Sequence, residues 1–536
     1  MNYFSLNNFK SFEKEQQVPL KPITLIYGAN SAGKSSVIQG YLLLNHIMKT
    51  GTCDPQLIET SWDQLDLGGF AQYSYKHKYA NETKISIDLK DGIRLELTIK
   101  AQTNDMSKLI GTSAFLSRVQ IFVDNELIVK FLKISPDNSV KYIVSGFNTK
   151  HANWINYYNE ALAIDEKDIK NLQFDLYKFT NGHSLNNYDK NLSKECFNIL
   201  DSTSVLELRV KDFLSMLINK IWEPVWQSNT VNTINENRLD ITYIGPLRDY
   251  PPRVISNDQR SDDLKDHTWS TLLRDSFVRE KVNKWFSNSN LMNPTYRFEV
   301  QQKLDPVDII LPLLDIFQDV DMNTGYIPDE LKPITSIEMN TDQEGSTKSY
   351  YLSLDNYSED GAAKLLKTIL ANITESNIYK KLNLIDERAN ISVSLRDVGV
   401  GISQVLPVLV NAYSKENRVS AIEQPELHLH PKLQSELADV FINTALGEEK
   451  KTFLIETHSE HLLLRIMRRI RETTNGQLPD GIEAIEAKDV QVLFVMPSQN
   501  GEGSIIKKIA LDEEGEMIDN WPGGFFEEGF NERFGI

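Results

Sequence analysis

The stretch GANSAGKSS, residues 28–36, limits what this chain can fold into more than any other stretch. It has the pattern G-x-x-x-x-G-K-S, with an apolar run at 23–27 before it and a helix-like run after it. A strand, a glycine loop and a helix in that order form the context in which this pattern binds phosphate. A glycine-rich loop before an ordinary helix is the alternative, and both flanks argue against it.

The residue types in this loop suit a bound phosphate chain. Gly28 and Gly33 permit a tight turn without a Cβ clash. Loop N–H groups and the helix N-terminus would face phosphate oxygens. Lys34 would neutralise charge on the β- and γ-phosphates, and the Ser35 hydroxyl would hold Mg²⁺.

Composition sets the broad class of the protein. A chain of 536 residues is too long for one compact core, so two or three domains are expected. The net charge of −18 argues against DNA binding over the whole surface, although a local basic patch stays open. The distant Cys53 and Cys196 form no metal motif. With no signal peptide or membrane-length apolar run, we expect a cytoplasmic protein without membrane contact.

The first half of the chain predicts strands around one helix. Strands are expected at 3–6 and 23–26, a helix at about 34–49, and a short strand and turn at 65–70. Alternation with period two predicts an antiparallel meander over roughly 84–145. Helical spacing follows at about 150–235, 263–287 and 360–382.

A second set of polar residues follows later strands. The apolar strand that begins near residue 418 ends in Glu423, which would reach Mg²⁺ directly or through water. The strand from Thr452 ends before His458, which would sense the γ-phosphate; a structural histidine is the alternative. Arg248 and Arg253 follow a strand at 241, where ligands bind in parallel sheets. They are candidates for phosphate or a facing subunit, or are plain surface arginines.

The segment DVGVGISQVLP, residues 397–407, is glycine-rich and opens a helix. A glycine-rich helix start is a phosphate-binding device. Because it lies far along the chain from the first phosphate loop, it raises the hypothesis that it serves the nucleotide of another subunit.

Taken together, these motifs resemble the ABC-type ATPases of the SMC-like, overcoming-lysogenization-defect (OLD) group. The resemblance covers about 1–80 and 385–536 and rests on GANSAGKSS, DVGVGISQVLP, AIEQPELHLHP and ETHSEHLL. The stretches YIGPLRDYPPR and WPGGFFEEGFNERF also resemble bacterial members. Several such ATPases belong to anti-phage systems, and those of Septu and PARIS are the nearest comparisons.

The resemblance implies ATP and Mg²⁺ as cofactors, and it implies roles by position. The Walker A residues are Gly28, Asn30, Gly33, Lys34, Ser35 and Ser36, and the Walker B acid is Glu423. The metal would lie on Ser35 and Glu423. The signature residues Gly401, Ser403 and Gln404 would bind the γ-phosphate held by a partner, and His458 would be the switch histidine. Such proteins dimerise head to tail, so a homo-oligomer is expected.

One position departs from the pattern of the group. Gln424 stands where a catalytic glutamate usually follows the Walker B acid. An amide cannot accept a proton from water as a carboxylate can, although it can orient water. Glu426 would act instead if the turn at Pro425 brings it inward. Glu423, Gln424, Glu426 and His458 are therefore the candidate catalytic residues, and the site suits a slow ATPase or a nucleotide-gated clamp.

OLD nucleases carry a nuclease domain after the ATPase, and the segment after His458 is short for such a domain. It predicts a strand at 490–495, a hairpin at 504–516 and an aromatic tail at 521–534, folded on its own domain or docked on a partner. We therefore hypothesise a separately encoded effector, a nuclease or toxin. The alternatives are an SMC-like DNA repair or chromosome clamp with direct DNA contact, and a single-chain nuclease.

The predicted fold class is α/β, a P-loop ABC-type ATPase head with an inserted β-meander and helical region. The predicted parts are 1–80 (head, Walker A), 81–240 (meander, then helices), 241–384 (strand, loop and helices) and 385–536 (head, with signature, Walker B, switch histidine and tail).

Overall fold

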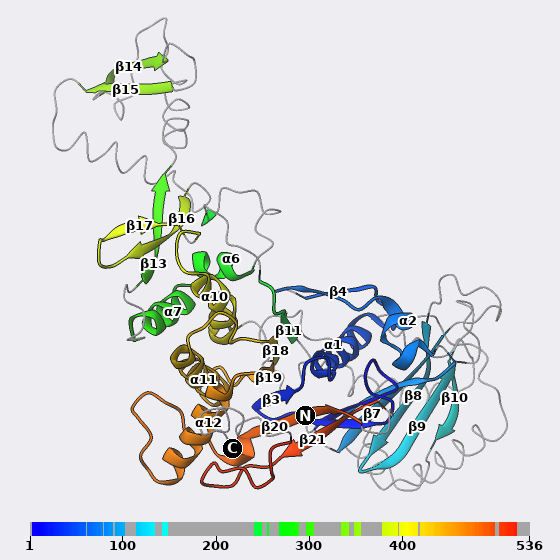
Figure 1. Ribbon diagram of the computed structural model, residues 1–536. Helices are drawn as coiled ribbons and strands as arrows, with labels where there is room; N and C mark the ends of the chain where they lie inside the picture. The colour runs from blue at the N-terminus through cyan, green and yellow to red at the C-terminus, as the bar shows by residue number, and fades with distance from the viewer. Residues whose placement is uncertain are drawn as a thin grey trace, which may run out of the picture.

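A computed structural model describes most of the two ends of the chain and parts of its middle (Figure 1). The described residues are 3–60, 62–78, 80–88, 92–101, 114–133, 142–147, 241–248, 255–256, 267–288, 296–304, 334–341, 348–354, 378–394, 396–415, 419–498 and 503–522. The helical region predicted at about 150–235 lies outside them.

A six-stranded sheet forms the centre of the molecule. Its order is β11-β18-β19-β3-β20-β21, with the first five strands parallel and β21 antiparallel to β20. The strands are β11 (Ile241–Ile244), β18 (Val419–Glu423), β19 (Thr452–Glu456), β3 (Ile23–Gly28), β20 (Val490–Pro497) and β21 (Ser504–Ile509). Every residue of β3 is buried. A continuous apolar run is what a parallel strand covered on both faces requires.

Helices cover the sheet on both faces, and alternate residues of β3 serve two separate cores. Helix α1 (Lys34–Thr50) packs with Ile26 in one core, and Leu25 faces the other core. The helices of that second core include α10 (Val400–Tyr413), α11 (Pro431–Leu446) and α12 (Glu460–Thr474). Figure 1 shows α10, α11 and α12 together on the side away from α1.

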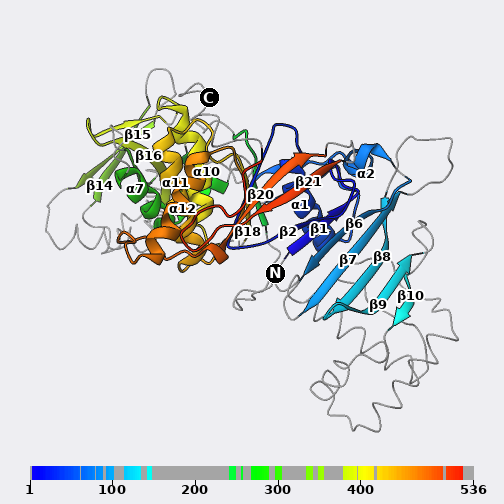
Figure 2. The ribbon, with the colours of Figure 1, turned by 60° about the horizontal axis from the view of Figure 1, so that its bottom comes forward.

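A seven-stranded antiparallel sheet packs against the other side of α1 (Figure 2). Its order is β10-β9-β8-β7-β6-β1-β2. The strands are β1 (Tyr3–Asn7), β2 (Gln16–Pro19), β6 (Thr83–Asp88), β7 (Ile93–Ala101), β8 (Ala114–Val123), β9 (Glu126–Lys133) and β10 (Tyr142–Phe147). The meander predicted from period-two alternation is confirmed. It is continuous with the N-terminal strands, because β6 pairs with β1, with Phe4 opposite Ile87. The boundary predicted after residue 80 therefore crosses this sheet.

Smaller elements complete the described part of the chain. One sheet contains β12 (Ile255–Ser256), β16 (Ile378–Asp386), β13 (Tyr296–Leu304) and β17 (Ile391–Val393). Helices α6 (His267–Arg274) and α7 (Ser276–Asn288) lie between it and α10. The remaining elements are β4 (Leu57–Glu59), β5 (Gln64–Asp66), α2 (Gly69–Tyr73), β14 (Ile334–Thr341), β15 (Lys348–Leu354) and the short 3₁₀ turns η1 (Tyr75–His77) and η4 (Ala487–Asp489).

Two local predictions differ from the structure. Residues 378–382, placed at the end of a helix, belong to strand β16, because each of them pairs with β13; the segment 360–377 lies outside the described residues. The predicted hairpin at 504–516 is replaced by pairing of β21 with β20, and a bridge joins Leu511 to Met517. Both predictions were based on residue spacing within a short segment, whereas the structure is determined by pairing with strands that lie farther away in the sequence.

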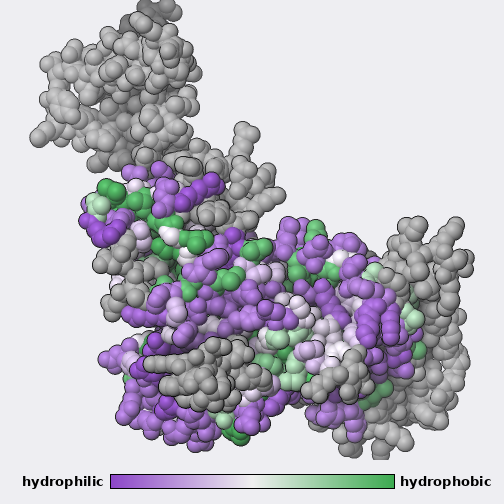
Figure 3. All heavy atoms as spheres, in the orientation of Figure 1, coloured by the Kyte–Doolittle hydropathy of each residue, from purple (hydrophilic) through white to green (hydrophobic). Residues whose placement is uncertain are grey.

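The start of the aromatic tail folds onto the central sheet. The Trp521 ring meets Tyr27 of β3 and Phe494 of β20 edge to face, with centroids 5.2 and 5.4 Å away. The tail beyond residue 522 lies outside the described residues. Figure 3 shows a mainly hydrophilic face over the described part of the chain, with scattered apolar patches. Within the described ranges, no helix is long and apolar enough to cross a bilayer.

The predicted fold class is confirmed in its main features. The structure combines a parallel sheet, a glycine loop between β3 and α1, and helices on both faces. Together they form an α/β fold in which a β-meander is joined to the N-terminal strands.

A substitution at Gly28 tests how closely β3 packs against the neighbouring strand β20. Gly28 has a φ of 146°, and an added Cβ would lie 2.2 Å from the Val495 carbonyl oxygen of β20. We expect Gly28→Ala to destabilise the protein by about 2–4 kcal/mol through backbone strain and this clash. Thermal unfolding without nucleotide should show a midpoint several degrees lower, on the order of 5 °C.

Gly399→Ala is the matched control, since an added Cβ there meets nothing within 4 Å and its φ is −56°. Equal midpoints for the two variants would contradict the tight contact between β3 and β20.

Candidate nucleotide-binding site

The site is built where three parallel strands end. Strand β19 lies between β3 and β18, so Glu456 pairs with Ile26 on one side and with Glu423 on the other. Backbone bonds lock this register: Gln424 N–H donates to the Glu456 carbonyl at 2.7 Å, and Thr457 N–H donates to the Ile26 carbonyl at 3.1 Å. Ligands bind beyond the carboxyl ends of such strands.

The P-loop connects β3 to α1 through three left-handed residues. Gly28, Ser31 and Gly33 have φ of 146°, 60° and 104°. Gly33 is the N-cap of α1 and makes no side-chain capping bond. The free N–H groups at such a helix start attract an anion.

Lys34 is buried and lies back along the P-loop. Its Nζ donates to the carbonyl oxygens of Gly28 and Ala29 at 3.1 and 3.0 Å. Burial lowers the pKa of Lys34, and the nearby carboxylates of Glu456, Glu426 and Glu423 oppose this shift. Asn30 is exposed at the rim of the loop, and Ser36 is buried behind it.

Ser35 and two buried acids lie together beside the loop. The Ser35 hydroxyl donates to Glu456 Oε2 at 2.7 Å, and the Tyr243 hydroxyl donates to Glu423 Oε1 at 3.0 Å. Glu423 and Glu456 are only 6% and 5% exposed. Predicted Ser35 and Glu423 are therefore brought together, and Glu456 is a site residue that sequence reasoning missed. The sequence feature that could have identified Glu456 is its position as an acid at the end of a strand, directly before Thr457 and His458.

Burial changes the titration of both acids. It raises the pKa of Glu423 to about 7; the Glu456 charge adds to this, and hydrogen bonds from Tyr243 and Ser35 oppose it. Burial also raises the pKa of Glu456, against the Ser35 hydrogen bond and the Lys34 charge. Two carboxylates this close favour a bound cation between them.

Glu426 is turned inward, where it joins two loops. Its carboxylate accepts from the Thr457 hydroxyl and from the His458 backbone N–H, each at 2.7 Å. Burial raises the pKa of Glu426. Its oxygens thus hold the loop after β18 against the loop after β19. Neighbouring Gln424 is half-buried and left-handed, with φ of 46°.

His458 is half-buried at the start of the segment that leads into α12. Burial lowers its pKa, and the Lys34 charge lowers it further. A neutral imidazole near Lys34 is therefore favoured at neutral pH, and a neutral ring has one donor and one acceptor nitrogen.

A turn between β1 and β2 also reaches the site, and sequence reasoning missed it. An added Cβ on Gly33 would lie 1.9 Å from Ser11 Oγ, so this turn rests on the P-loop. Burial lowers the pKa of the adjacent Lys10, opposed by the charges of Asp66 and Glu423. Lys10 is thus a second cation near Glu423, and it lies in a stretch whose sequence indicates only a polar turn.

Arg248 is not a plain surface arginine, because its side chain is half-buried and bound to the main chain. Contact with a phosphate or a facing subunit stays a prediction. The Arg248 guanidinium donates to the main-chain carbonyls of Gln404 at 2.9 Å, Glu423 at 3.0 Å and Gln424 at 3.2 Å. The Gln404 side chain donates back to the Arg248 carbonyl at 3.1 Å. Burial lowers the pKa of Arg248 to about 10. Arg253 lies outside the described residues.

The signature residues contact their own chain. Ser403 is 2% exposed and its hydroxyl donates to the Val400 carbonyl. Gln404 is also buried. An added Cβ on Gly401 would lie 2.7 Å from the His428 carbonyl oxygen, so α10 begins directly against the Walker B loop. Contact of these three residues with a partner's phosphate stays a prediction.

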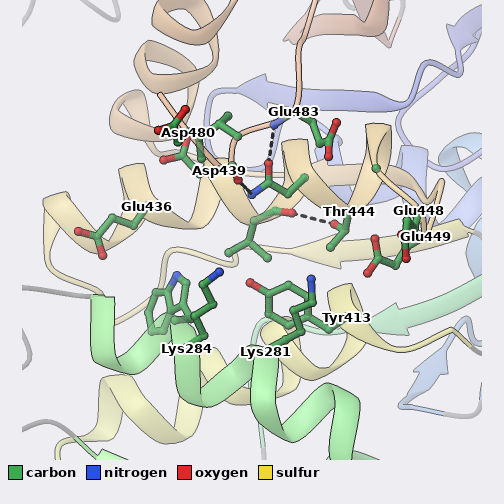
Figure 4. Close-up of a pocket in the computed structure, with 16 residues that line it drawn as sticks. Lys281, Lys284, Tyr413, Glu436, Asp439, Thr444, Glu448, Glu449, Asp480 and Glu483 are labelled. Carbon is green, nitrogen blue, oxygen red and sulfur yellow. Dashed lines mark hydrogen bonds between the residues drawn. The ribbon is translucent and has the colours of Figure 1, made fainter. Parts of the chain in front are cut away.

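A separate cavity of about 520 Å³ lies between α7, α11 and the loops near residues 448 and 481 (Figure 4). Lys281 and Lys284 line one wall, and acidic residues such as Glu448, Glu449 and Glu483 line the other. None of its lining residues belongs to the P-loop, the Walker B loop or the signature residues, so it is distinct from the candidate nucleotide site.

A family model described as an AAA ATPase domain matches residues 1–463. This chain belongs to that family. A second model, described as a protein of unknown function (DUF3696), matches residues 485–533. A comparison with curated proteins gives no match.

Solved structures similar to this chain include heads of SMC proteins. The SMC head domain from Thermotoga maritima is 8% identical with a TM-score of 0.32, covering 95% of this chain and 100% of that chain. An SMC head bound to the C-winged helix domain of ScpA is 10% identical, with a TM-score of 0.33 and coverages of 95% and 98%. The Pyrococcus furiosus SMC head is 9% identical, with a TM-score of 0.31 and coverages of 95% and 96%. The assignment of this chain as a P-loop ATPase therefore rests on its family and its own geometry.

Arg248→Ala should destabilise the head, because it removes three hydrogen bonds to the main chain, each worth about 1 kcal/mol. Arg248→Lys should give an intermediate loss, since one ammonium group does not span three carbonyls as a guanidinium does. Thermal unfolding measures both, with Arg274→Ala, at an exposed arginine, as control. If Arg248→Ala is as stable as the control, the bracing role is wrong.

The raised pKa of Glu423 predicts a pH dependence without metal or nucleotide. The folded pKa of about 7 lies above the ordinary glutamate value of 4.5, so the folded state holds the proton to higher pH than the unfolded state does. The free energy of unfolding should therefore fall as pH rises from about 4.5 to 7, by about 1.4 kcal/mol for each pH unit in that interval.

Denaturant unfolding at pH 5, 6, 7 and 8 measures this dependence. Glu423→Gln should reduce the slope, and Glu456 and Glu426, whose pKa values burial also raises, should keep part of it. An unchanged profile in that variant would assign the dependence to other groups.

Proposed function

We propose that this chain binds ATP with Mg²⁺ at the P-loop and hydrolyses it slowly. The observation that supports this best is the meeting of the loop, Lys34, Ser35 and two strand-end acids at one sheet edge. The loop and the α1 N-terminus would bind phosphate oxygens, and Lys34 would exchange its two loop carbonyls for β- and γ-phosphate oxygens.

The donor set suits Mg²⁺. Mg²⁺ prefers oxygen ligands and takes one or two carboxylates together with substrate phosphates. The Ser35 hydroxyl and the buried Glu423 carboxylate offer such oxygens. When bound, the ion would neutralise charge on the β- and γ-phosphates.

Slow hydrolysis is expected from the residues that would surround the attacking water. Gln424 would orient this water by hydrogen bonding, without accepting its proton. His458, neutral at pH 7, would contact the γ-phosphate through a donor nitrogen. Glu426 is held by Thr457 and His458, so it would keep the two loops in place.

Lys34→Ala should abolish nucleotide binding, because it removes the cation that faces the phosphates. Titration of a fluorescent ATP analogue with Mg²⁺ measures this, and the loss should be at least about 100-fold in Kd, equal to about 2.7 kcal/mol. Lys508→Ala, at an exposed lysine of β21, is the matched control. Unchanged affinity in Lys34→Ala would refute the proposed site.

We further propose that ATP drives self-association through the face that carries the start of α10. Leu247 is 88% exposed and Val400 is 40% exposed. Arg248, next to Leu247, binds Gln404 in the first turns of α10, so these apolar residues belong to one end of the structure. The exposed Gly399 and its neighbouring N–H groups would meet a partner's γ-phosphate, with Ser403 supporting the helix from inside.

Analytical ultracentrifugation with a slowly hydrolysed ATP analogue tests this association. A shift from monomer to dimer or higher is expected with the analogue. Leu247→Asp should prevent the shift without lowering nucleotide affinity, because only the exposed face changes. Leu464→Asp, at an exposed leucine of α12, is the control. Association that persists in Leu247→Asp would place the interface elsewhere.

The downstream role proposed is control of a separately encoded effector, a nuclease or toxin, in anti-phage defence. It is supported by the resemblance of the four motifs to defence ATPases. Copurification of the tagged protein with its genomic neighbours, with and without ATP, tests it. A nuclease or toxin whose release or activity follows the nucleotide would support the role. Salt-sensitive DNA binding without a protein partner would favour a DNA clamp.

A further inference from the structure

We propose that Glu456 is a second carboxylate ligand on the metal side of the nucleotide site, beside Glu423. This inference rests on the proposed binding of ATP and Mg²⁺. It assigns a role to a residue that the P-loop, Walker B and signature patterns leave without one.

The position of β19 in the sheet supports this role. This strand pairs with β3 and with β18 at once, so its last residue lies between the P-loop strand and the Walker B strand. Glu456 is therefore one strand closer to the P-loop than Glu423. Residues at this edge face the ligand crevice of a parallel sheet.

The contacts of the two acids agree with that position. Ser35, the hydroxyl that would bind Mg²⁺, donates to Glu456 at 2.7 Å. It also lies within hydrogen-bonding reach of Glu423, which accepts from Tyr243 at 3.0 Å. Among the described residues, Ser35 is the one side chain hydrogen-bonded to the Glu456 carboxylate. Because the Glu456 carboxylate already contacts the hydroxyl that would bind Mg²⁺, it needs little movement to become a ligand of the same ion.

Glu426 shows what a structural acid looks like in the same neighbourhood. Its carboxylate accepts from the Thr457 hydroxyl and the His458 backbone, so both oxygens are engaged by the chain itself. Within the described part of the chain, Glu456 makes no such bridge between loops. Glu426 therefore braces the loops, whereas Glu456 faces the P-loop.

The departure at Gln424 points to the same role for Glu456. Gln424 N–H donates to the Glu456 carbonyl, so the amide and the acid are neighbours on adjacent strands. With an amide at position 424, Glu423 and Glu456 are the acids at the ends of β18 and β19, and Glu456 accepts from Ser35 at 2.7 Å.

Glu456→Gln keeps the shape and removes the charge, which makes it the decisive variant. Electron paramagnetic resonance of Mn²⁺ measures metal affinity in the complex with a slowly hydrolysed ATP analogue. We expect the metal affinity to fall by about 10- to 100-fold, within the range that loss of a metal-supporting group produces. Binding of the analogue without metal should change less than about twofold.

Glu472→Gln is the matched control, because it makes the same change in a half-buried acid of α12 that is paired with Arg468 and Arg469 outside the nucleotide site. It should lower the midpoint of thermal unfolding and leave Mn²⁺ affinity within about threefold of the wild type. Glu456→Asp is the second variant if Glu456→Gln does not fold; it keeps the charge but withdraws it by one methylene, and should also weaken Mn²⁺ binding. Folded Glu456 variants with wild-type Mn²⁺ affinity would overturn the assignment.

The two proposals fail in different ways. If the wild type and Lys34→Ala bind the analogue equally, the nucleotide site itself is wrong. If the wild type binds analogue and Mn²⁺, Lys34→Ala does not, and Glu456→Gln matches the wild type, only the role of Glu456 is wrong.

Discussion

The pairing of β19 between β3 and β18 is the constraint on which the rest of the site depends. Side chains alternate along a strand, so a shift of one residue in this pairing would turn Glu456 away from Ser35. The same shift would break the bonds from Gln424 and Thr457 that hold the two strand ends. The apolar residues Leu454 and Ile455, buried in opposite cores, make such a shift costly. Packing far from the loop thus sets the geometry of the acids.

Arg248 extends this geometry to the signature helix. The half-buried guanidinium binds the carbonyls of Gln404, Glu423 and Gln424 and so ties the start of α10 to the end of β18. Gly401 adds to it, because its lack of a side chain lets α10 approach His428. Any displacement of the Walker B end by a nucleotide would therefore move the surface proposed to meet a second copy. Arg248 would thus couple the two parts of the proposed function, nucleotide binding and self-association.

The sequence allowed prediction of the parts of the site that depend on local order. The P-loop, its strand and its helix, the strand-end acid Glu423 and the meander all follow from motifs or periodicity within short stretches. Glu456 and Lys10 could not be assigned in that way, because their roles arise from strand pairing and from a turn folded over Gly33. The main-chain contacts of Arg248 could not be predicted for the same reason, since its partner Gln404 is distant in the chain. Local patterns also could not show that Ser403 points inward.

The order of strands in the central sheet has a consequence for synthesis of the protein. Strand β3 is complete by residue 28, but its neighbours β19 and β20 begin at residues 452 and 490. During translation the P-loop strand therefore emerges early and has both edges unpaired until β19 and β20 have been made. Unpaired apolar strands of nascent chains are sites of aggregation. The antiparallel sheet of β1, β2 and β6–β10 needs only residues up to 147 and packs on the same helix α1. It can thus shelter the P-loop segment while the ribosome is still making the strands that will complete the nucleotide site.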